Sequence, residues 1–448
     1  MTEEKLERSL GRWDLTAIAI NTIIGAGIFG LPAKAYALIG SYSIIALAAC
    51  ALVFALIVLC YCEVASRFDS TGGPYLYAKK AYGAVVGFEV GWLYWIVRVT
   101  TFAANCNLLV TYLGFFIPSL NDGYPRVVVM GLVVTLITVV NILGVRQTAV
   151  LTNIVTAGKI LPLLVFVAVG LFFIQPANFS FETVPTTASF SAAVLLLVYA
   201  FSGFESATIL AGETKEPERN FPFSLLVALG TVAVLYLLIQ FVAIGTYPNL
   251  GASERPLADA ANIFLGGFGA SLIVAGAVIS IFGNLNVGAL NCARLTYAMS
   301  EHREVPQLLS RVHPKFRTPY VSILLNAIVV LVLASMSSFL TAVAISSITR
   351  LMVYATTCGA LAIFRWRADA PASESDEPGS RRSDVRPARF VVPFGVVVAF
   401  LSLGLIAWLL TNIDFAKEGV PVLIAAAIGF AIYFAYRVFS NRGDDLRT

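Results

Sequence analysis

Three glycines near the N-terminus have the spacing of a backbone site for anions. Gly25, Gly27 and Gly30 satisfy the pattern G-x-G-x-x-G. That pattern holds the pyrophosphate of a dinucleotide when a strand precedes it and an acidic residue follows about 20 positions later. Here the flanking residues are apolar and the next acidic residue is Glu63. The context therefore argues against a nucleotide site.

Two other interpretations of these glycines stay open. Small residues allow membrane helices to pack closely. Alternatively, the helix unwinds here, and the N–H groups of Gly25, Ala26 and Gly27 bind a carboxylate with the help of a half-helix dipole. Unpaired backbone is tolerated at membrane depth only where it is buried or lines a cavity. The second interpretation therefore predicts a cavity at this point.

A lysine lies deep in an apolar segment. Lys159 is about eleven residues into the segment 148–174, roughly 16 Å along a helix at 1.5 Å per residue. Its side chain can reach back to water or to a carbonyl group. It can also bind and release a proton, because burial disfavours the charged form of a lysine. We treat Lys159 as the candidate for proton coupling.

Three more ionisable residues lie at membrane depth, where each is a functional candidate. Glu205 can contact a substrate amine, or its carboxylate can be satisfied by hydroxyl groups or an arginine. Arg98 can pair with Glu205 or reach an acidic substrate, and a structural ion pair is the favoured reading. Arg350 presents the same ambiguity. Glu63 and Arg67, near the end of their segment, are expected to form a solvated pair worth little.

The elements that position these residues are membrane helices. The chain is 58% hydrophobic and 12% charged, whereas soluble domains are about 45–50% apolar and about 25% charged. Apolar runs long enough to cross a bilayer, about 20 residues each, recur along the chain. The approximate spans are 15–40, 42–66, 84–117, 127–143, 148–174, 190–212, 223–247, 269–299, 320–335, 339–364, 390–410 and 420–439. We therefore predict an all-α polytopic membrane protein with about twelve spans.

The basic residues predict the orientation of these spans. Short loops rich in Lys and Arg stay in the cytoplasm. One face carries most of the basic residues, and the other has only Arg126, Arg255 and Lys417, with Lys34 near its edge. Both termini are therefore expected in the cytoplasm, in an inner or plasma membrane. The net charge of +4 reflects this topology and gives no reason to expect nucleic acid as a partner.

The predicted organisation has five parts. Residues 1–14 form a cytoplasmic N-terminal segment and residues 15–366 form a transport core of ten helices. Residues 367–389, rich in Ala, Ser, Asp, Glu, Arg and Pro, form a disordered cytoplasmic linker. Residues 390–439 form two further helices, and residues 440–448 form a cytoplasmic tail. A short surface helix is expected within 300–318.

The first and sixth spans share small, helix-weakening residues near their middle. These are Gly25-Ala26-Gly27 in one span and Ser202-Gly203 in the other, five helices apart. Interruptions at corresponding positions of two halves are typical of inverted-repeat transporters with broken helices. We predict a five-plus-five inverted repeat with helices one and six broken, followed by two extra helices.

Several segments resemble the amino acid–polyamine–organocation (APC) transporters. The resemblance extends from Leu10 to about Arg367, and its main motifs are Ile24-Gly25-Ala26-Gly27-Ile28-Phe29 with Leu31-Pro32, Gly72-Gly73-Pro74-Tyr75-Leu76-Tyr77, and Phe201-Ser202-Gly203-Phe204-Glu205. It implies alternating access and an amino acid held between helices one and six.

The resemblance also implies roles for individual residues. The substrate carboxylate would meet the amides of Gly25, Ala26 and Gly27, and the ammonium would meet carbonyls near Ile23, Phe201 and Ser202. Phe201 would be an aromatic gate with Tyr199 beside it, although an aromatic residue in an apolar helix is more often simple packing. Lys159 would stand where sodium-coupled relatives place a cation, which implies sodium independence.

The leading hypothesis is a proton-coupled, sodium-independent permease for the uptake of neutral L-amino acids, because most of the presumed lining is apolar. The alternatives are an obligatory exchanger of basic amino acids or amines, with Glu205 recognising the cation, and a sensor that binds amino acids without moving them. With only His302 and His313 available, no metal cluster or nucleophile–base set is visible. We therefore expect no enzyme, metal or cofactor. The expected partners are the amino acid, protons and the bilayer. The sequence does not identify the amino acid, the choice between symport and exchange, or the oligomeric state.

Overall fold

The computed structural model describes residues 10–68, 72–121, 123–144, 149–208, 214–301, 303–369 and 387–445. Within these ranges the regular structure is helical, apart from one isolated bridge between Leu10 and Thr214. Residues 370–386, most of the predicted linker, lie outside the described ranges, as do the chain ends 1–9 and 446–448.

Among the described residues, six helices form the first five spans, with one short helix between the second and third spans. The broken first span consists of α1 (Arg12–Ile23) and α2 (Ala26–Ile39), and α3 (Ser43–Ala65) is the second span. The short helix α4 (Gly73–Tyr82) precedes α5 (Ala84–Leu113), and α6 (Gly123–Ile142) and α7 (Ala149–Gly170) follow. Short 3₁₀ turns connect them at Gly40–Tyr42 and Pro118–Leu120.

The second group of five spans begins with another broken helix. It consists of α8 (Thr187–Phe201) and α9 (Glu205–Thr208), and α10 (Pro217–Thr246) follows. The longest helix, α11 (Pro256–Glu301), bends at Gly266, where φ is +63°. It leads to α12 (Tyr320–Met336) and α13 (Phe339–Asp369). Two 3₁₀ turns, Leu171–Phe173 and Pro176–Asn178, lie between α7 and α8, and two more lie within this half at Leu250–Ala252 and Gln307–Ser310.

Two further helices complete the described chain. They are α14 (Gly395–Leu410) and α15 (Val420–Asp445), joined through a π-helical turn at Phe415–Gly419. Eight helical segments of the described chain are long and apolar enough to cross a membrane, and one of them, 26–65, contains both α2 and α3. The shorter apolar helices α8, α12 and α14 add three more. These segments fit roughly twelve spans, as the sequence predicted.

The outside of the bundle is apolar, as expected for a surface that faces lipid. Leu52, Leu132 and Phe400 are each more than 60% exposed although they lie in the middle of helices. Many polar residues point inward instead, and the side chains of Glu63, Lys159 and Glu205 are fully buried. This reversal of the soluble pattern follows from the apolar environment of the bilayer. The protein is therefore an integral membrane protein.

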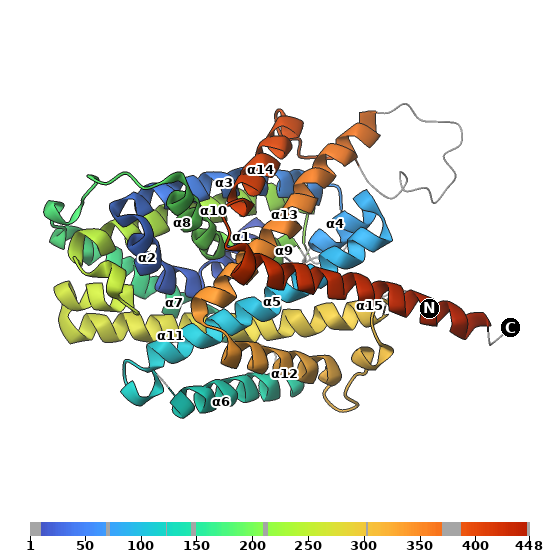
Figure 1. Cartoon of the computed structure of the whole chain (residues 1–448), viewed down its shortest axis with the longest axis horizontal. Coiled ribbons are helices and arrows are strands. Elements are labelled where there is room, and N and C mark those ends of the chain that lie inside the picture. The colour runs from blue at the N-terminus through green and yellow to red at the C-terminus, as the bar shows by residue number, and fades with distance from the viewer. Residues whose placement is uncertain are drawn as a thin grey trace.

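The centre of the bundle is built by helices far apart in the sequence. In Figure 1, α5 (cyan) and α11 (yellow) run alongside one another, and α6 and α12 lie together at the edge. Helix α13 packs on α5, and α2 packs on α8. Both broken spans are consequently brought to the middle of the molecule.

Two predicted boundaries differ from the structure. Helix α13 continues to Asp369, so the first residues of the predicted linker 367–389 are helical. The surface helix expected within 300–318 is only the short 3₁₀ turn Gln307–Ser310. Pro306 and Pro314 flank this turn, and proline cannot continue a helix because it lacks a backbone donor and clashes with the preceding turn.

Candidate functional site

The first span breaks at Ile24 and Gly25. Helix α1 ends at Ile23, and Gly25 adopts φ −137° and ψ −148° before α2 begins at Ala26. A Cβ atom at position 25 would meet the side-chain amide of Asn284 on α11, which would have to move to make room. The first N–H groups of α2 have no acceptor within their own helix. They lie at the positive end of its dipole.

The sixth span breaks at residues 202–204. Gly203 has φ +116°, which favours glycine because other residues meet a steric penalty there. The Glu205 carboxylate accepts a hydrogen bond from the Gly203 N–H at 3.0 Å, and the Ser202 hydroxyl donates to the Tyr199 carbonyl at 2.7 Å. Side chains next to the break therefore satisfy part of its exposed backbone.

The two breaks lie against each other. A Cβ atom at Gly203 would be 2.5 Å from the Thr22 carbonyl oxygen, and one at Gly27 would be 2.7 Å from the Ala200 Cα. The two interpretations of the glycines are therefore compatible. Gly27 permits close packing of α2 on α8, while Gly25 lies where the helix is interrupted.

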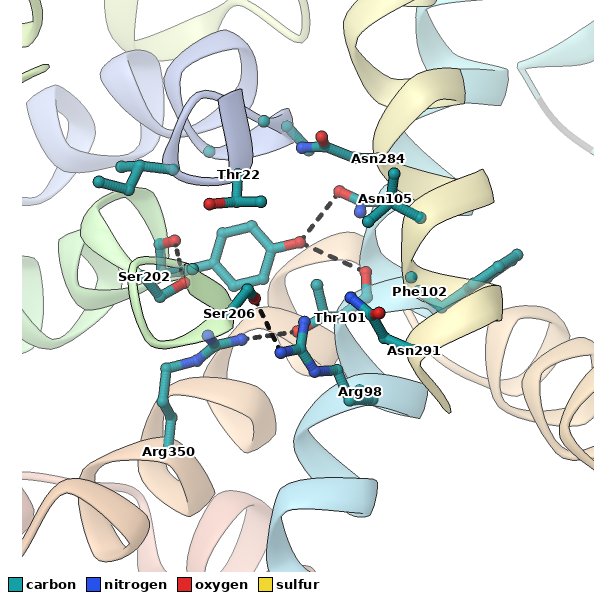
Figure 2. A pocket seen from close by; sticks show the side chains of 18 residues that line it. Thr22, Arg98, Thr101, Phe102, Asn105, Ser202, Ser206, Asn284, Asn291 and Arg350 are labelled. Atoms are coloured by element: carbon teal, nitrogen blue, oxygen red, sulfur yellow. Dashed lines mark hydrogen bonds between the residues drawn. The ribbon is translucent and has the colours of Figure 1, made fainter. Parts of the chain in front are cut away.

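A pocket opens where the two breaks meet (Figure 2). It holds about 640 Å³ of space not filled by protein atoms, part of it continuous with solvent. Six residues predicted from the sequence line it, namely Ile23, Gly25, Ala26, Gly27, Tyr199 and Ser202. The remaining lining residues are Thr22, Arg98, Thr101, Phe102, Asn105, Gly203, Ser206, Asn284, Val287, Gly288, Asn291 and Arg350. Ten of these eighteen residues carry polar or charged side chains and the other eight are apolar or glycine, so the lining is mixed.

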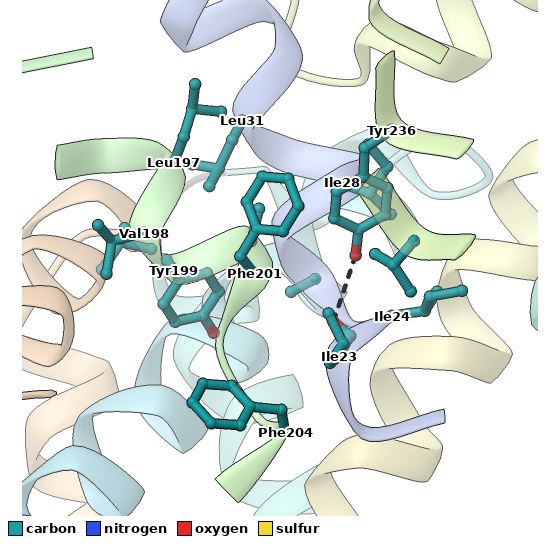
Figure 3. Close-up of a cluster of buried hydrophobic side chains, with 14 of the residues drawn as sticks. Ile23, Ile24, Ile28, Leu31, Leu197, Val198, Tyr199, Phe201, Phe204 and Tyr236 are labelled. Carbon is teal, nitrogen blue, oxygen red and sulfur yellow. Dashed lines mark hydrogen bonds between the residues drawn. The ribbon is translucent and has the colours of Figure 1, made fainter. Parts of the chain in front are cut away.

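Phe201 does not line this pocket. Its ring is fully buried in a cluster with Leu31, Leu197 and Tyr236 (Figure 3). The ring centroid lies 5.5 Å from that of Tyr236 and 5.6 Å from that of Phe54. In this conformation Phe201 packs the back of the break, and its role as a gate remains a prediction.

Tyr199 lies at the pocket itself. Its hydroxyl donates to the Asn105 side-chain carbonyl at 3.1 Å. Its ring makes an edge contact with Phe339, with centroids 6.4 Å apart. Phe339 also packs against Gly30, where a Cβ atom would be 2.7 Å from the ring. Tyr199 and Phe339 therefore close one end of the pocket.

Lys159 reaches the first break from α7. Its ammonium donates to the carbonyl oxygens of Asn21 at 3.0 Å and Ile24 at 3.1 Å, and to the side-chain oxygen of Asn284 at 3.3 Å. The two carbonyl oxygens belong to the last turn and C-cap of α1, where a helix dipole favours a cation. The buried lysine thus places a positive charge where α1 unwinds, next to the pocket.

Glu205 is paired with Arg350. The two side chains form a buried ion pair at 2.6 Å, and the second carboxylate oxygen accepts from the Tyr354 hydroxyl at 2.9 Å. Arg350 also donates to Thr101 at 2.9 Å. The pairing of Arg98 with Glu205, considered from the sequence, is not made. Both carboxylate oxygens of Glu205 are occupied, and Glu205 does not line the pocket.

Arg98 lines the pocket without a partner carboxylate. Its guanidinium donates to the Ser206 hydroxyl at 2.9 Å and to the Tyr94 hydroxyl, and it stacks 4.6 Å from the centre of the Tyr94 ring. Within the described part of the chain, no Asp or Glu forms an ion pair with it. Figure 2 shows the Arg98 side chain beside Asn291.

Glu63 differs from its expected role as a solvated pair. It is fully buried and binds Arg365 through two hydrogen bonds of 2.8 and 2.5 Å. It also accepts from Arg67 at 3.1 Å and from the Val392 N–H at 2.8 Å. A buried carboxylate must be satisfied by several donors. Because these donors come from different segments, the network ties α3 to α13 and to the chain before α14.

Three asparagines of the pocket were missed from the sequence. Asn105 lies on α5, and Asn284 and Asn291 lie on α11. Asn284 also donates to the Ile24 carbonyl at 3.4 Å, so it touches the first break directly. The available signal was the presence of amide side chains inside apolar spans, where polar groups mark functional positions.

Comparison with known proteins gives a consistent result. A family model described as "Amino acid permease" matches residues 10–433. The sequence is 28% identical to the serine/threonine exchanger SteT of Bacillus subtilis, over 96% of this chain and 97% of the relative. It is 26% identical to two other proteins of B. subtilis, a methylthioribose transporter and the branched-chain amino acid permease BcaP. Each of those alignments covers 97% of this chain and 94% of the relative.

Proposed function

This chain belongs to the amino acid permease family, and from that premise we propose that it is a proton-coupled, sodium-independent secondary transporter that takes up amino acids by alternating access. We place it in the plasma membrane with both termini in the cytoplasm. The carrying observation is the pocket between two broken helices that touch each other.

The pocket offers backbone groups of both polarities. Gly25, Ala26 and Gly27 line it at the positive end of α2, so their N–H groups are the candidate donors. The carbonyl groups of Ile23, Phe201 and Ser202 belong to the C-terminal ends of α1 and α8, where the dipole is negative. In this proposal the substrate carboxylate binds the first set and the ammonium binds the second. These are the groups common to all α-amino acids.

Lys159 supplies the coupling in this proposal. Its ammonium holds α1 by two carbonyl oxygens at the break. Loss of the proton removes the charge that binds these oxygens, so the protonation state of Lys159 and the position of α1 depend on each other. The resemblance to the APC transporters implies that Lys159 stands where sodium-coupled members place a cation, which supports sodium independence.

From the predicted orientation we assign two further cavities as the inner and outer vestibules of the transport path. The inner vestibule is lined by Gly72, Tyr75, Leu76, Lys79, Lys80, Tyr94, Arg98, Ser206, Asn291, Arg294, Leu295, Ala298 and Met299. It shares Arg98, Ser206 and Asn291 with the pocket. The outer vestibule is lined by Lys34, Asn107, Thr111, Asn121, Arg126, Glu254, Arg255 and residues 335–340. The contact of Tyr199 with Phe339 lies between it and the pocket. In this proposal the arrangement represents a conformation open toward the cytoplasm.

The pocket limits which substrate side chains can bind. Neutral substrates were expected from an apolar lining, and the names of two relatives refer to neutral amino acids. The lining also contains polar side chains, however, and two of them are arginines. A basic substrate is disfavoured because none of the described lining residues is acidic and Glu205 is held by Arg350.

Uptake into proteoliposomes tests this function. With labelled amino acids outside, an imposed inward proton gradient is expected to drive accumulation in sodium-free buffer. Accumulation that follows a sodium gradient and ignores the proton gradient would contradict the coupling. Accumulation only into vesicles preloaded with unlabelled substrate would show an obligatory exchanger, as the name of one relative states. Binding without any uptake would show a sensor.

A further inference from the structure

Arg98 is positioned to contact a substrate rather than to close an ion pair. It lies on α5 and lines both the central pocket and the inner vestibule. Its hydrogen bonds go to two uncharged hydroxyl groups, those of Tyr94 and Ser206. A guanidinium has five N–H donors in a planar fork, so these contacts leave donors available toward the pocket.

The charges around the pocket do not balance. Arg98 and Arg350 both line it, and among the described lining residues none is acidic. The nearby Glu205 carboxylate compensates one guanidinium through its 2.6 Å pair with Arg350. Two guanidinium groups therefore share one carboxylate. An uncompensated charge is costly when a transporter closes and excludes water.

We propose that the pocket takes an acidic amino acid and that Arg98 binds its side-chain carboxylate; this rests on the proposed function. The α-carboxylate binds at Ala26 and Gly27 on one wall, and the second carboxylate meets Arg98 on another. A substrate with a net negative charge then supplies a carboxylate to Arg98, which forms no ion pair with a described Asp or Glu. A neutral zwitterion, whose own charges cancel, leaves Arg98 without such a partner.

The outer vestibule gives an independent argument. The face predicted to be external has few basic residues, yet Lys34, Arg126 and Arg255 all line this one cavity. Lys34 is paired with Glu254 at 2.8 Å. The Nε and Nη1 atoms of Arg255 are buried and have no hydrogen-bond partner among the described residues. A basic entrance attracts anions before they reach the binding site. The positive-inside rule does not explain it, because that rule concerns cytoplasmic loops.

The decisive comparison uses substrates of the same shape. L-asparagine has an amide where L-aspartate has its side-chain carboxylate, and L-glutamine differs from L-glutamate in the same way. Equilibrium binding and proteoliposome uptake of all four are measured with the full-length wild-type protein at one ionic strength. We expect the acid of each pair that fits the pocket to bind at least about tenfold more tightly than its amide, as for a hydrogen bond to a charged group.

Two variants test whether Arg98 causes this preference. Arg98→Gln is expected to remove the preference for the acid, and Arg98→Lys to restore part of it because lysine keeps the charge but loses the planar fork. Arg311→Gln, at an exposed arginine, is the control and should behave like the wild type. Size-exclusion chromatography shows whether each variant is folded. If Arg98→Gln is not folded, the comparison of acid and amide binding by the wild type decides alone.

The outcomes separate this proposal from the proposed function. Equal binding of acid and amide by the wild type, or an unchanged preference in folded Arg98→Gln, overturns the acidic substrate while amino acid uptake stands. If the wild type takes up none of the common amino acids under any gradient or preloading, the proposed function fails and this inference fails with it.

Discussion

Gly203 packs against Thr22 so closely that a Cβ atom added at position 203 would lie 2.5 Å from the Thr22 carbonyl oxygen. Each residue lies at or beside a break in its span, the first and the sixth. The two interruptions that the sequence places about 180 residues apart are thus parts of one site.

Gly203→Ala is expected to disrupt this contact. The new methyl group meets backbone, which cannot move as a flexible side chain can, and φ +116° is unfavourable for alanine. Uptake and the melting temperature should both fall. Gly230→Ala is the matched control, because Gly230 lies inside α10 with nothing within 4 Å of the added atom. That variant should be as stable as the wild type or slightly more so. If both variants have the same uptake and melting temperature, the close contact between the two breaks is not required.

Glu205→Gln is expected to lower the free energy of unfolding by about 3–5 kcal/mol, because it leaves the buried Arg350 charge without a carboxylate. Thermal unfolding in detergent measures the loss. Glu218→Gln removes the partner of the largely exposed Arg389, and exposed pairs are worth about 0–1 kcal/mol. A loss at Glu205 no larger than that at Glu218 would contradict a structural role for the buried pair.

Lys159→Ala should uncouple transport from protons. The variant loses the cation that binds the Asn21 and Ile24 carbonyl oxygens. A pH gradient should no longer drive accumulation, whereas the exchange of labelled for unlabelled substrate tests the pocket itself. Accumulation by Lys159→Ala that still follows the pH gradient would assign coupling to another group.

Arg255→Gln should weaken the attraction of an acidic substrate to the outer vestibule. The apparent KM for that substrate should rise at low ionic strength, with little change in the maximal rate, and the difference should shrink as salt screens the charge. Lys417→Gln is the control, since Lys417 is also on the face predicted to be external but is 84% exposed and does not line the vestibule. A KM that is independent of both residue 255 and salt would exclude steering by this vestibule.

The sequence predicted the parts of the site that depend on local chemistry. Glycine weakens a helix, so Gly25 and Gly203 marked the breaks. Lys159 was recognisable because few charged residues lie so deep in an apolar segment. The prediction that backbone groups bind the substrate follows from the same local features, since an interrupted helix leaves N–H and C=O groups unpaired.

The parts that were not predicted depend on how helices rotate and pack. Arg98 and Arg350 both lie at membrane depth, and the tertiary packing of α13 is what brings Arg350 to Glu205 on α9. Phe201 and Tyr199 are two residues apart on α8, yet one packs into the core and the other lines the pocket. Hydrophobic patterning carries little information on such rotations, because both faces of a buried membrane helix can be apolar.

Substitution of Ala26 by proline tests the central claim, that the amides of the first break bind the substrate carboxylate. Ala26 is the first residue of α2, where proline is tolerated and removes only the N–H group. Thr187→Pro makes the same change at the first residue of α8, on the surface. We expect equilibrium binding of the preferred amino acid to weaken at least about tenfold in Ala26→Pro and to be unchanged in Thr187→Pro. Wild-type affinity in folded Ala26→Pro would contradict the account.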